Sequence, residues 1–137
     1  MKTSEQNVIN ENAMNNLLNQ AVFKKYPLLI VGNLTQNTYY MLTSENFTST
    51  KCSVAGTFDE LIESGCSTIH DMDKDLFKKT FSRENLLKEH EKGTEKVEIR
   101  VIQEGDDGQL RRVEITDYFV EDEASDDVLV VSFNRNM

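Results

Sequence analysis

Two short segments of the chain, Leu28-Leu29-Ile30-Val31 and Val128-Leu129-Val130-Val131, are apolar at every position. A strand that is covered on one side alternates apolar and polar residues, whereas a strand that is covered on both sides is apolar throughout. We therefore expect both segments to be central strands of a sheet with a layer on each face. Because one segment begins the series of strands and the other ends it, we expect the two strands to be neighbours.

Periodicity and turn signals divide the rest of the chain into helices and strands. Apolar residues at helical spacing predict a helix from residue 5 to about 24, before the single proline, Pro27. The string Thr57-Phe58-Asp59-Glu60 predicts a second helix, which stops at Gly65. Two further helices are expected from about Asp71 and after Ser82, and these could also form one kinked helix. Strands are expected at 28–34, 38–43, 96–102, 110–120 and 128–133.

The N-terminal helix has one apolar side, with asparagines on the other. Asparagine is a poor helix former, so this helix needs a surface to pack against. Because the middle helices can cover only one face of the sheet, we expect the N-terminal helix to cover the outer face, within the chain or across a dimer. The candidates for this outer surface are Met14, Leu17, Leu18, Ala21, Leu29, Val31, Val128 and Val130.

The chain has 137 residues, a length typical of one domain, and a formal net charge of -9. This charge repels phosphates, so we expect neither a nucleic acid nor an anionic membrane surface as a partner. The sequence has no apolar run long enough to span a bilayer and no secretory signal, and we expect a cytoplasmic domain. Cys52 and Cys66 are too few for a disulfide framework and too far apart for a close-spaced zinc pair.

Several local strings, in their order along the chain, resemble the PAS domain. They are Phe58-Asp59-Glu60-Leu61-Ile62, Ile69-His70-Asp71-Met72-Asp73, the string from Phe81 to Leu87, and Gly108-Gln109-Leu110-Arg111-Arg112-Val113. The match covers residues 27 to 134, and the string at 81–87 is similar to a bacterial subgroup found ahead of diguanylate cyclase, phosphodiesterase or kinase domains. Asp71 and Arg112 depart from the pattern, because relatives usually have proline and tryptophan there.

The resemblance implies an α+β fold with a five-stranded antiparallel sheet in the order 2-1-5-4-3 and helices on one face. In this order the first and last strands are neighbours, in agreement with the expectation from their apolar faces. Residues 1–25 are then an N-terminal amphipathic helix, and residues 26–137 are a sensor domain. The resemblance further implies a non-enzymatic signal-input domain of a larger bacterial signalling protein, a homodimer and a covalently linked output domain. The alternatives are a ligand-free dimerisation module and a small enzyme.

A small-molecule cavity is expected between the inner face of the sheet and the helices, and the alternative is a filled core made of the same residues. Asp117 is unusual, because alternation with Val113, Ile115 and Phe119 puts its carboxyl on the core side of its strand. Either a β-bulge turns this side chain outward, or it has a polar role inside. The candidate cavity residues are Tyr40, Leu42, Phe58, Ile62, Phe77, Ile99, Ile115, Asp117, Phe119 and Phe133.

Cofactor and catalytic signals are weak in this sequence. Cys52 lacks the sequence context of the flavin-binding light sensors of the family, His70 is expected to hydrogen-bond to its own turn, and His90 is expected in solvent. We therefore expect neither flavin nor haem, and the cofactor stays unassigned. Solvated carboxylates explain the acidic turns better than a metal site or a paired-carboxylate hydrolase. No catalytic residue and no metal ligand is proposed.

Overall fold

The structure is a computed structural model that describes residues 4–43 and 53–137, with side chains from residue 12 onward. The helices are α1 (Ser4–Lys25), α2 (Phe58–Cys66), the short 3-10 helix η1 (Asp71–Asp73), α3 (Lys74–Phe81) and α4 (Arg83–Glu91). The strands are β1 (Leu28–Asn33), β2 (Thr38–Thr43), β3 (Ala55–Gly56), β4 (Lys96–Glu104), β5 (Leu110–Glu121) and β6 (Val128–Asn136). The predicted helices and long strands are present, and Cys52 lies outside the described residues.

The strands form one antiparallel sheet in the order β3-β2-β1-β6-β5-β4. β1 lies between β2 and β6, with Ile30 opposite Met41 on one side and opposite Ser132 on the other. The two segments that are apolar at every position are therefore central neighbours, as their composition predicted. β5 pairs with β6 on one side and with β4 on the other.

The five long strands follow the order that the family resemblance implied, but the sheet has a sixth strand. This strand, β3, consists of Ala55 and Gly56, which pair with Tyr40 and Tyr39 beside β2. The predicted count of five strands was wrong by one. Two small residues carry no alternation of apolar and polar positions, so the sequence contains no signal from which this strand could be recognised.

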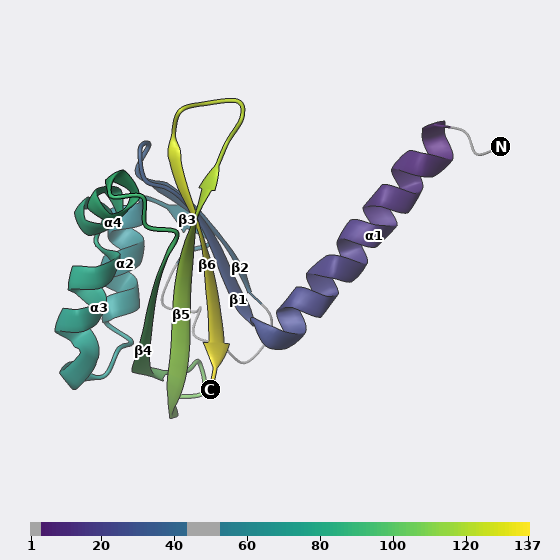
Figure 1. Cartoon of the computed structure of the whole chain (residues 1–137). Helices are drawn as coiled ribbons and strands as arrows, with labels where there is room; N and C mark the ends of the chain where they lie inside the picture. Colours follow the sequence, from purple (N-terminus) through teal and green to yellow (C-terminus); the bar gives the residue numbers. More distant parts are fainter. Residues whose placement is uncertain (1–3, 44–52) are drawn as a thin grey trace.

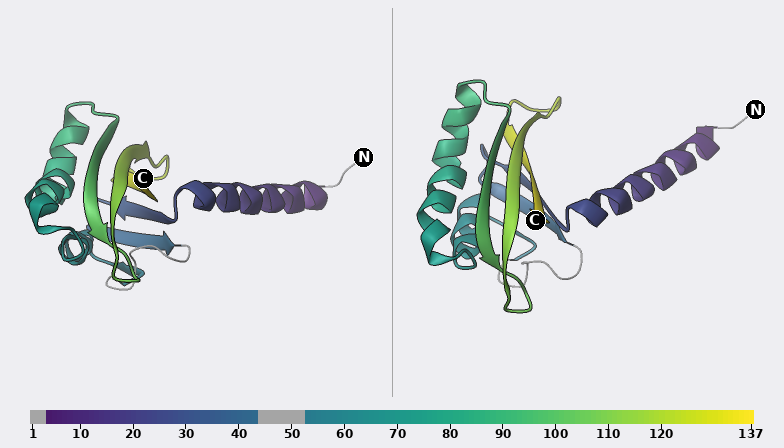
Figure 2. Two further views of the ribbon diagram at one scale, coloured as in Figure 1. Left: turned by 90° about the horizontal axis from the view of Figure 1, so that it is seen from below. Right: turned by 60° about the horizontal axis from the view of Figure 1, so that its bottom comes forward.

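Helices α2, α3 and α4 lie against one face of the sheet, which we call the inner face (Figures 1 and 2). Between these layers lies the hydrophobic core, in which Leu34, Phe81, Leu86 and Val130 are fully buried. Ser82 separates α3 from α4, because its side-chain oxygen accepts a hydrogen bond from the backbone N–H three residues on, at 3.2 Å. Of the two alternatives from the sequence, the structure therefore has two separate helices and not one kinked helix.

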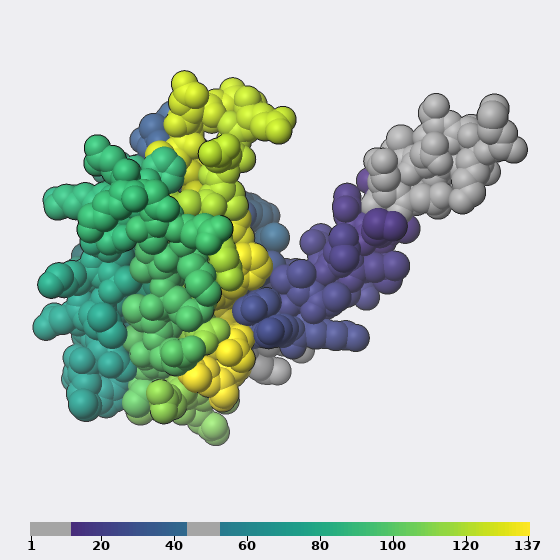
Figure 3. Space-filling model, viewed as in Figure 1, coloured from purple at the N-terminus to yellow at the C-terminus, as the bar shows by residue number. Residues whose placement is uncertain are grey.

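The opposite face of the sheet, which we call the outer face, is covered by no helix of the described chain (Figure 2). Instead, α1 projects away from the sheet, and its described residues stand clear of the domain (Figures 1 and 3). Met14, Leu17 and Leu18 are between 57% and 65% exposed. The expectation that α1 covers the outer face of its own chain was therefore wrong, whereas covering across a dimer requires a second chain and stays a prediction.

The direction of α1 follows from its short connection to β1, which consists of Tyr26 and Pro27. A residue before proline is restricted to an extended conformation. The ring of Tyr26 also packs edge-to-face against Phe133, with ring centroids 5.1 Å apart. These two constraints hold the end of α1 at the base of the sheet and keep the helix pointing away from the outer face.

Gly32→Ala is expected to destabilise the domain, because the new β-carbon would lie 2.8 Å from Phe58 Cε2 and 3.1 Å from Val130 Cγ2. Both neighbours belong to the buried core, so the crowding lowers the free energy of unfolding by about 1–3 kcal/mol. Urea unfolding followed by circular dichroism measures this loss.

Gly56→Ala is the matched control, since its β-carbon would meet no atom closer than 3.4 Å. This control is expected to change the free energy of unfolding by less than about 0.5 kcal/mol. Equal losses in the two variants would contradict the close packing of Phe58 on β1.

Candidate functional site

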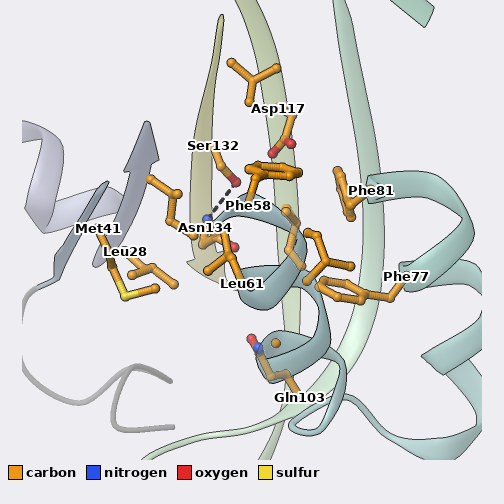
Figure 4. Close-up of a pocket in the computed structure, with 15 residues that line it drawn as sticks. Leu28, Met41, Phe58, Leu61, Phe77, Phe81, Gln103, Asp117, Ser132 and Asn134 are labelled. Carbon is orange, nitrogen blue, oxygen red and sulfur yellow. Dashed lines mark hydrogen bonds between the residues drawn. The ribbon is translucent and has the colours of Figure 1, made fainter. Parts of the chain in front are cut away.

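A cavity lies between the inner face of the sheet and helices α2 and α3 (Figure 4). The centres of water molecules can occupy about 60 Å³ of it, which is room for roughly four to six waters. Its lining comes from two helices and five strands. The lining residues are Leu28, Ile30, Met41, Phe58, Leu61, Ile62, Gly65, Phe77, Phe81, Gln103, Ile115, Asp117, Val130, Ser132 and Asn134.

The helices supply an apolar wall, and their local sequence explains why. α2 begins after Thr57, whose side-chain oxygen accepts a hydrogen bond from the backbone N–H three residues on, at 3.1 Å. This cap sets the phase of the helix, so that Phe58 and Leu61 share the face turned to the sheet. In α3, Phe77 and Phe81 lie one turn apart and pack edge-to-face, with ring centroids 5.6 Å apart.

The sheet supplies a short polar row formed by Asp117 of β5 and by Ser132 and Asn134 of β6 (Figure 4). Asp117 and Ser132 are directly opposite each other in the antiparallel register, so their side chains point to the same face. Asn134 Nδ2 donates a hydrogen bond to Ser132 Oγ at 3.0 Å. Ser132 in turn is hydrogen-bonded to the Asp117 carboxyl.

Asp117 is buried, with 3% of its surface exposed. Burial raises the pKa of Asp117 to about 6, because desolvation disfavours the charged form, and the hydrogen bond with Ser132 opposes this rise. Its Oδ1 atom has no hydrogen-bond partner among the described residues. The register of β5 with both neighbouring strands is continuous at this position, so the inward alternative, and not the β-bulge, is present.

A second buried acceptor, Oε1 of Gln103, belongs to the other end of the cavity (Figure 4). Gln103 Nε2 donates to Thr68 Oγ1 at 2.8 Å, while Oε1 has no partner among the described residues. Asp117 lies opposite Val97, six residues before Gln103 on β4, which separates the two polar ends by roughly 20 Å along the strand. The cavity thus has an acid near one end, an amide near the other and apolar side chains between them.

Five of the residues that were predicted to line a cavity do line it, namely Phe58, Ile62, Phe77, Ile115 and Asp117. The helical residues were recognisable because the apolar face of a short capped helix can be read from its spacing. The two residues of β5 were recognisable because this strand alternates apolar and polar positions. Contact of these residues with a ligand stays a prediction.

Three other predicted cavity residues, Tyr40, Leu42 and Phe133, point to the outer face, so their assignment was wrong. Tyr40 is 53% and Leu42 44% exposed, while the adjacent Tyr39 and Met41 are buried. Both β2 and β6 have apolar residues at consecutive positions. Alternation therefore does not indicate whether the odd or the even positions of these strands point inward. An error of one residue in the assignment exchanges the two faces.

Ile99 and Phe119 were also predicted to line the cavity, but they lie outside its lining. Both are partly buried and pack against the hydrophobic core. The ring of Phe119 faces His90, with ring centroids 5.4 Å apart. The pattern of a strand indicates the face to which a residue points but not its position along a cavity, and this explains the error.

The slip of one residue in β6 also affects Val128 and Val130, which were predicted for the outer face but point inward. Val130 is 1% exposed and lines the cavity, and Val128 packs against the core. Sequence reasoning consequently missed Ser132 and Asn134, which lie on the same face. A signal was present, because these two polar residues flank Phe133, but polar residues of a strand usually face solvent.

The outer face carries a partly exposed apolar surface, together with the exposed side of α1. Val31 is 43% exposed and Leu29 is half-buried, and both point outward as predicted. The predicted residues of α1 are exposed as well. The exposed apolar residues of the two elements together are Met14, Leu17, Leu18, Ala21, Val31, Tyr40, Leu42, Tyr118 and Val120.

The two histidines lie outside the cavity lining. His70 caps η1, because its Nδ1 accepts a hydrogen bond from Met72 N at 3.2 Å, which is the turn role that the sequence predicted. His90 is exposed, also as predicted. Within the described parts of the chain, no three His, Cys, Asp or Glu side chains gather in a way that could hold a metal ion. The described helices include none with the length and apolar character needed to cross a bilayer.

No protein-family model and no curated protein matches the chain, but solved structures do. One is a sensory box histidine kinase/response regulator from Burkholderia thailandensis E264, with a TM-score of 0.51, 12% identity, and coverage of 86% of this chain and 82% of that chain. Another is the N-terminal domain of a diguanylate cyclase with PAS/PAC sensor from Marinobacter aquaeolei, with a TM-score of 0.49, 12% identity, and coverage of 80% and 93%.

At 12% identity, the likeness to the sensory box structure concerns the fold. The order of the five long strands and the helices on one face of the sheet are those that the resemblance to the PAS domain implied. The chain therefore has a PAS-like fold, with its cavity enclosed between the sheet and the helices.

Proposed function

We propose that this domain is the signal-input part of a larger bacterial signalling protein and that it binds a small molecule in its cavity. The observation that carries the proposal is the buried oxygen of Asp117, which has no partner among the described residues and lies in a mostly apolar cavity. A buried polar atom without a partner lowers stability. A ligand that contacts this carboxyl gives a reason for its presence.

Two further observations support an input domain without catalytic activity of its own. One of the solved structures with a similar fold is named as a sensory box histidine kinase/response regulator, which fits an input domain linked to an output domain. Among the described lining residues, the ionisable side chain is Asp117 alone, without histidine, lysine or cysteine. A serine nucleophile is ordinarily activated by a histidine or a lysine, so the hydrogen-bonded pair of Ser132 and Asp117 in this lining lacks the usual base.

A second proposal, homodimerisation through the outer face, rests on a different observation. The outer face and α1 both expose apolar side chains, and α1 projects beyond its own domain (Figure 3). Leu17 and Leu18 of one chain would gain burial on the outer face of a second chain, near Val31 and Tyr40. Such an exchange covers in two copies the surfaces that one copy leaves exposed.

Leu61→Phe is expected to abolish retention of a small molecule, because Leu61 lines the cavity and a larger ring there occupies the space of the ligand. Native mass spectrometry of the purified chain measures retention as a mass above that of the polypeptide. Leu110→Phe is the matched control, since Leu110 is 57% exposed and lies outside the lining. A bound mass that persists in Leu61→Phe, or a wild-type protein without any bound mass, counts against the proposal.

Asp117 also makes stability depend on pH in a defined direction. Its pKa is raised from the ordinary value of 3.8 to about 6, so the folded state binds this proton more tightly than the unfolded state. Because the pKa of this acid is raised on folding, protonation of Asp117 stabilises the folded state most below about pH 4. This stabilisation is lost as the pH rises through 6. The shift corresponds to about 3 kcal/mol.

Asp117→Asn removes this titration, so the variant is expected to gain stability relative to wild type as the pH rises from 4 to 7, by about 2 kcal/mol. Urea unfolding of both proteins at several pH values measures the difference in their free energies of unfolding. The titration of groups that both proteins share cancels in this difference. Asp126→Asn changes the same charge at an exposed site and is expected to give a flat difference. A relative loss of stability in Asp117→Asn toward pH 7 would mean that the carboxylate is stabilising.

The double variant Leu17→Glu/Leu18→Glu is expected to be monomeric, because two charges on the apolar side of α1 prevent its burial against a second copy. Light scattering coupled to size exclusion measures the mass in solution. Asn16→Glu/Asn19→Glu adds the same charge on the polar side and is expected to leave a dimer. If the wild-type chain is monomeric at high as well as at low concentration, dimerisation through this surface is refuted.

A further inference from the structure

The open polar atoms of the cavity are hydrogen-bond acceptors. Asp117 Oδ1 and Gln103 Oε1 both have no partner among the described residues. The Ser132 hydroxyl is already engaged, because it accepts from Asn134 and is hydrogen-bonded to Asp117. A ligand that satisfies either end of the cavity must therefore supply N–H or O–H donors.

The charge of Asp117 has no cationic partner in the cavity. The described lining from β1, β2, β4, β6, α2 and α3 contains no lysine, arginine, histidine or second acid. The residues opposite Asp117 in the sheet are Val97 on β4 and Ser132 on β6, which are both uncharged. A cationic ligand compensates this charge, whereas a neutral ligand leaves it uncompensated and an anion is repelled.

A carboxylate on the outer side of the same strand is treated differently. Glu114 is buried too, but Arg135 Nε lies 2.8 Å and Arg100 Nη2 3.1 Å from its oxygens. These arginines lower the pKa of Glu114. The chain thus surrounds one buried acid of β5 with cations and leaves the other, Asp117, without any in the cavity lining.

The size and the walls of the cavity limit the rest of the ligand. The whole cavity has room for the centres of water molecules in about 60 Å³, so a ligand at Asp117 has no more than roughly four to six non-hydrogen atoms. Asp117 points toward the ring of Phe58, and Phe77 and Phe81 follow along the helical wall (Figure 4). Beside the carboxyl, a ligand therefore meets aromatic and aliphatic surface, which favours a short alkyl group.

We propose that the cavity binds a small alkylammonium ion, whose N–H groups donate to Asp117 while its alkyl part contacts Phe58 and Phe77. This inference rests on the proposed function, because it names the ligand class of the same cavity. Protonation of the carboxyl removes the charge that the cation meets. Since burial raises the pKa of Asp117 to about 6, the affinity falls as the pH is lowered through this value.

The test uses the full chain and three probes of nearly the same shape, which are isobutylammonium chloride, isobutanol and sodium isobutyrate. Isothermal titration calorimetry at pH 7.5 is expected to give an affinity for the ammonium ion about tenfold or more above that for the alcohol, with the carboxylate weakest. At pH 5 the affinity for the ammonium ion is expected to fall by about tenfold, whereas the affinity for the alcohol changes little.

Asp117→Asn is expected to abolish the preference for the ammonium ion over the alcohol, whereas Asp126→Asn is expected to keep the wild-type preference. Amide chemical shifts of the wild-type chain locate the site without any variant, and we expect shifts at Phe58, Asp117 and Ser132.

Equal affinity for alcohol and ammonium ion would overturn the ligand class but leave a cavity that binds small molecules. Binding of the ammonium ion that survives Asp117→Asn, or maps to the acidic turn at 121–127, would overturn it as well. If none of the probes binds, the ligand class fails. The proposed function then stands or falls separately, on the molecule retained by the purified chain.

Discussion

The antiparallel pairing of β1 with β6 is the constraint on which the rest of the domain depends. Residues 28–33 lie opposite residues 134–129, so the first and last long strands meet at the centre of the sheet. β2 continues the sheet from β1, and β5 and β4 continue it from β6. The register of this pair places Leu28 beside Asn134 and Ile30 beside Ser132, which together form part of the cavity floor. A shift by one residue would put Phe133 into the cavity and Ser132 on the outer face, and the site would not exist.

The central pairing of β1 with β6 could be predicted from the apolar faces of these strands, and the rest of the strand order followed from the resemblance to the PAS domain. The facing of the side chains could be predicted only in part. A segment that is apolar at every position indicates a central strand. Because it has no alternation, it does not indicate which of its residues point inward. In β5, polar and apolar residues alternate, and Ile115 and Asp117 were placed correctly. In β6, the inward set contains Ser132 and Asn134, so the more polar residues are the buried ones, against the usual rule. Only the register with β1 and β5 resolves this, and a register is a property of the assembled sheet. The direction of α1 is likewise set by tertiary contacts, through the packing of Tyr26 on Phe133.

The two buried acids of β5 differ in whether the protein compensates their charge. Glu114 sits among Arg100 and Arg135, and such an arrangement offsets the cost of burying a charge. Asp117 lies three residues away on the opposite face, and within the cavity it has a serine hydroxyl and no cation. Positions at which a sequence breaks a local rule without compensation tend to be functional. The uncompensated acid, more than the shape of the cavity, is therefore the reason for our proposal that a ligand binds at the inner face.

Under the proposed function, a ligand at Asp117 lies close to the joint between the domain and α1. Ser132, which is hydrogen-bonded to Asp117, is followed on β6 by Phe133, and successive residues of a strand point to opposite faces. Phe133 contacts Tyr26, the residue that links α1 to the sheet, with ring centroids 5.1 Å apart. A movement of β6 that adjusts Ser132 to a ligand also displaces Phe133, because the two share one backbone. Under this proposal the cavity and the base of α1 would be coupled across a single strand, and a small shift there would change the angle at which α1 leaves the domain. In a dimer held by α1, that angle sets the relative orientation of the two chains.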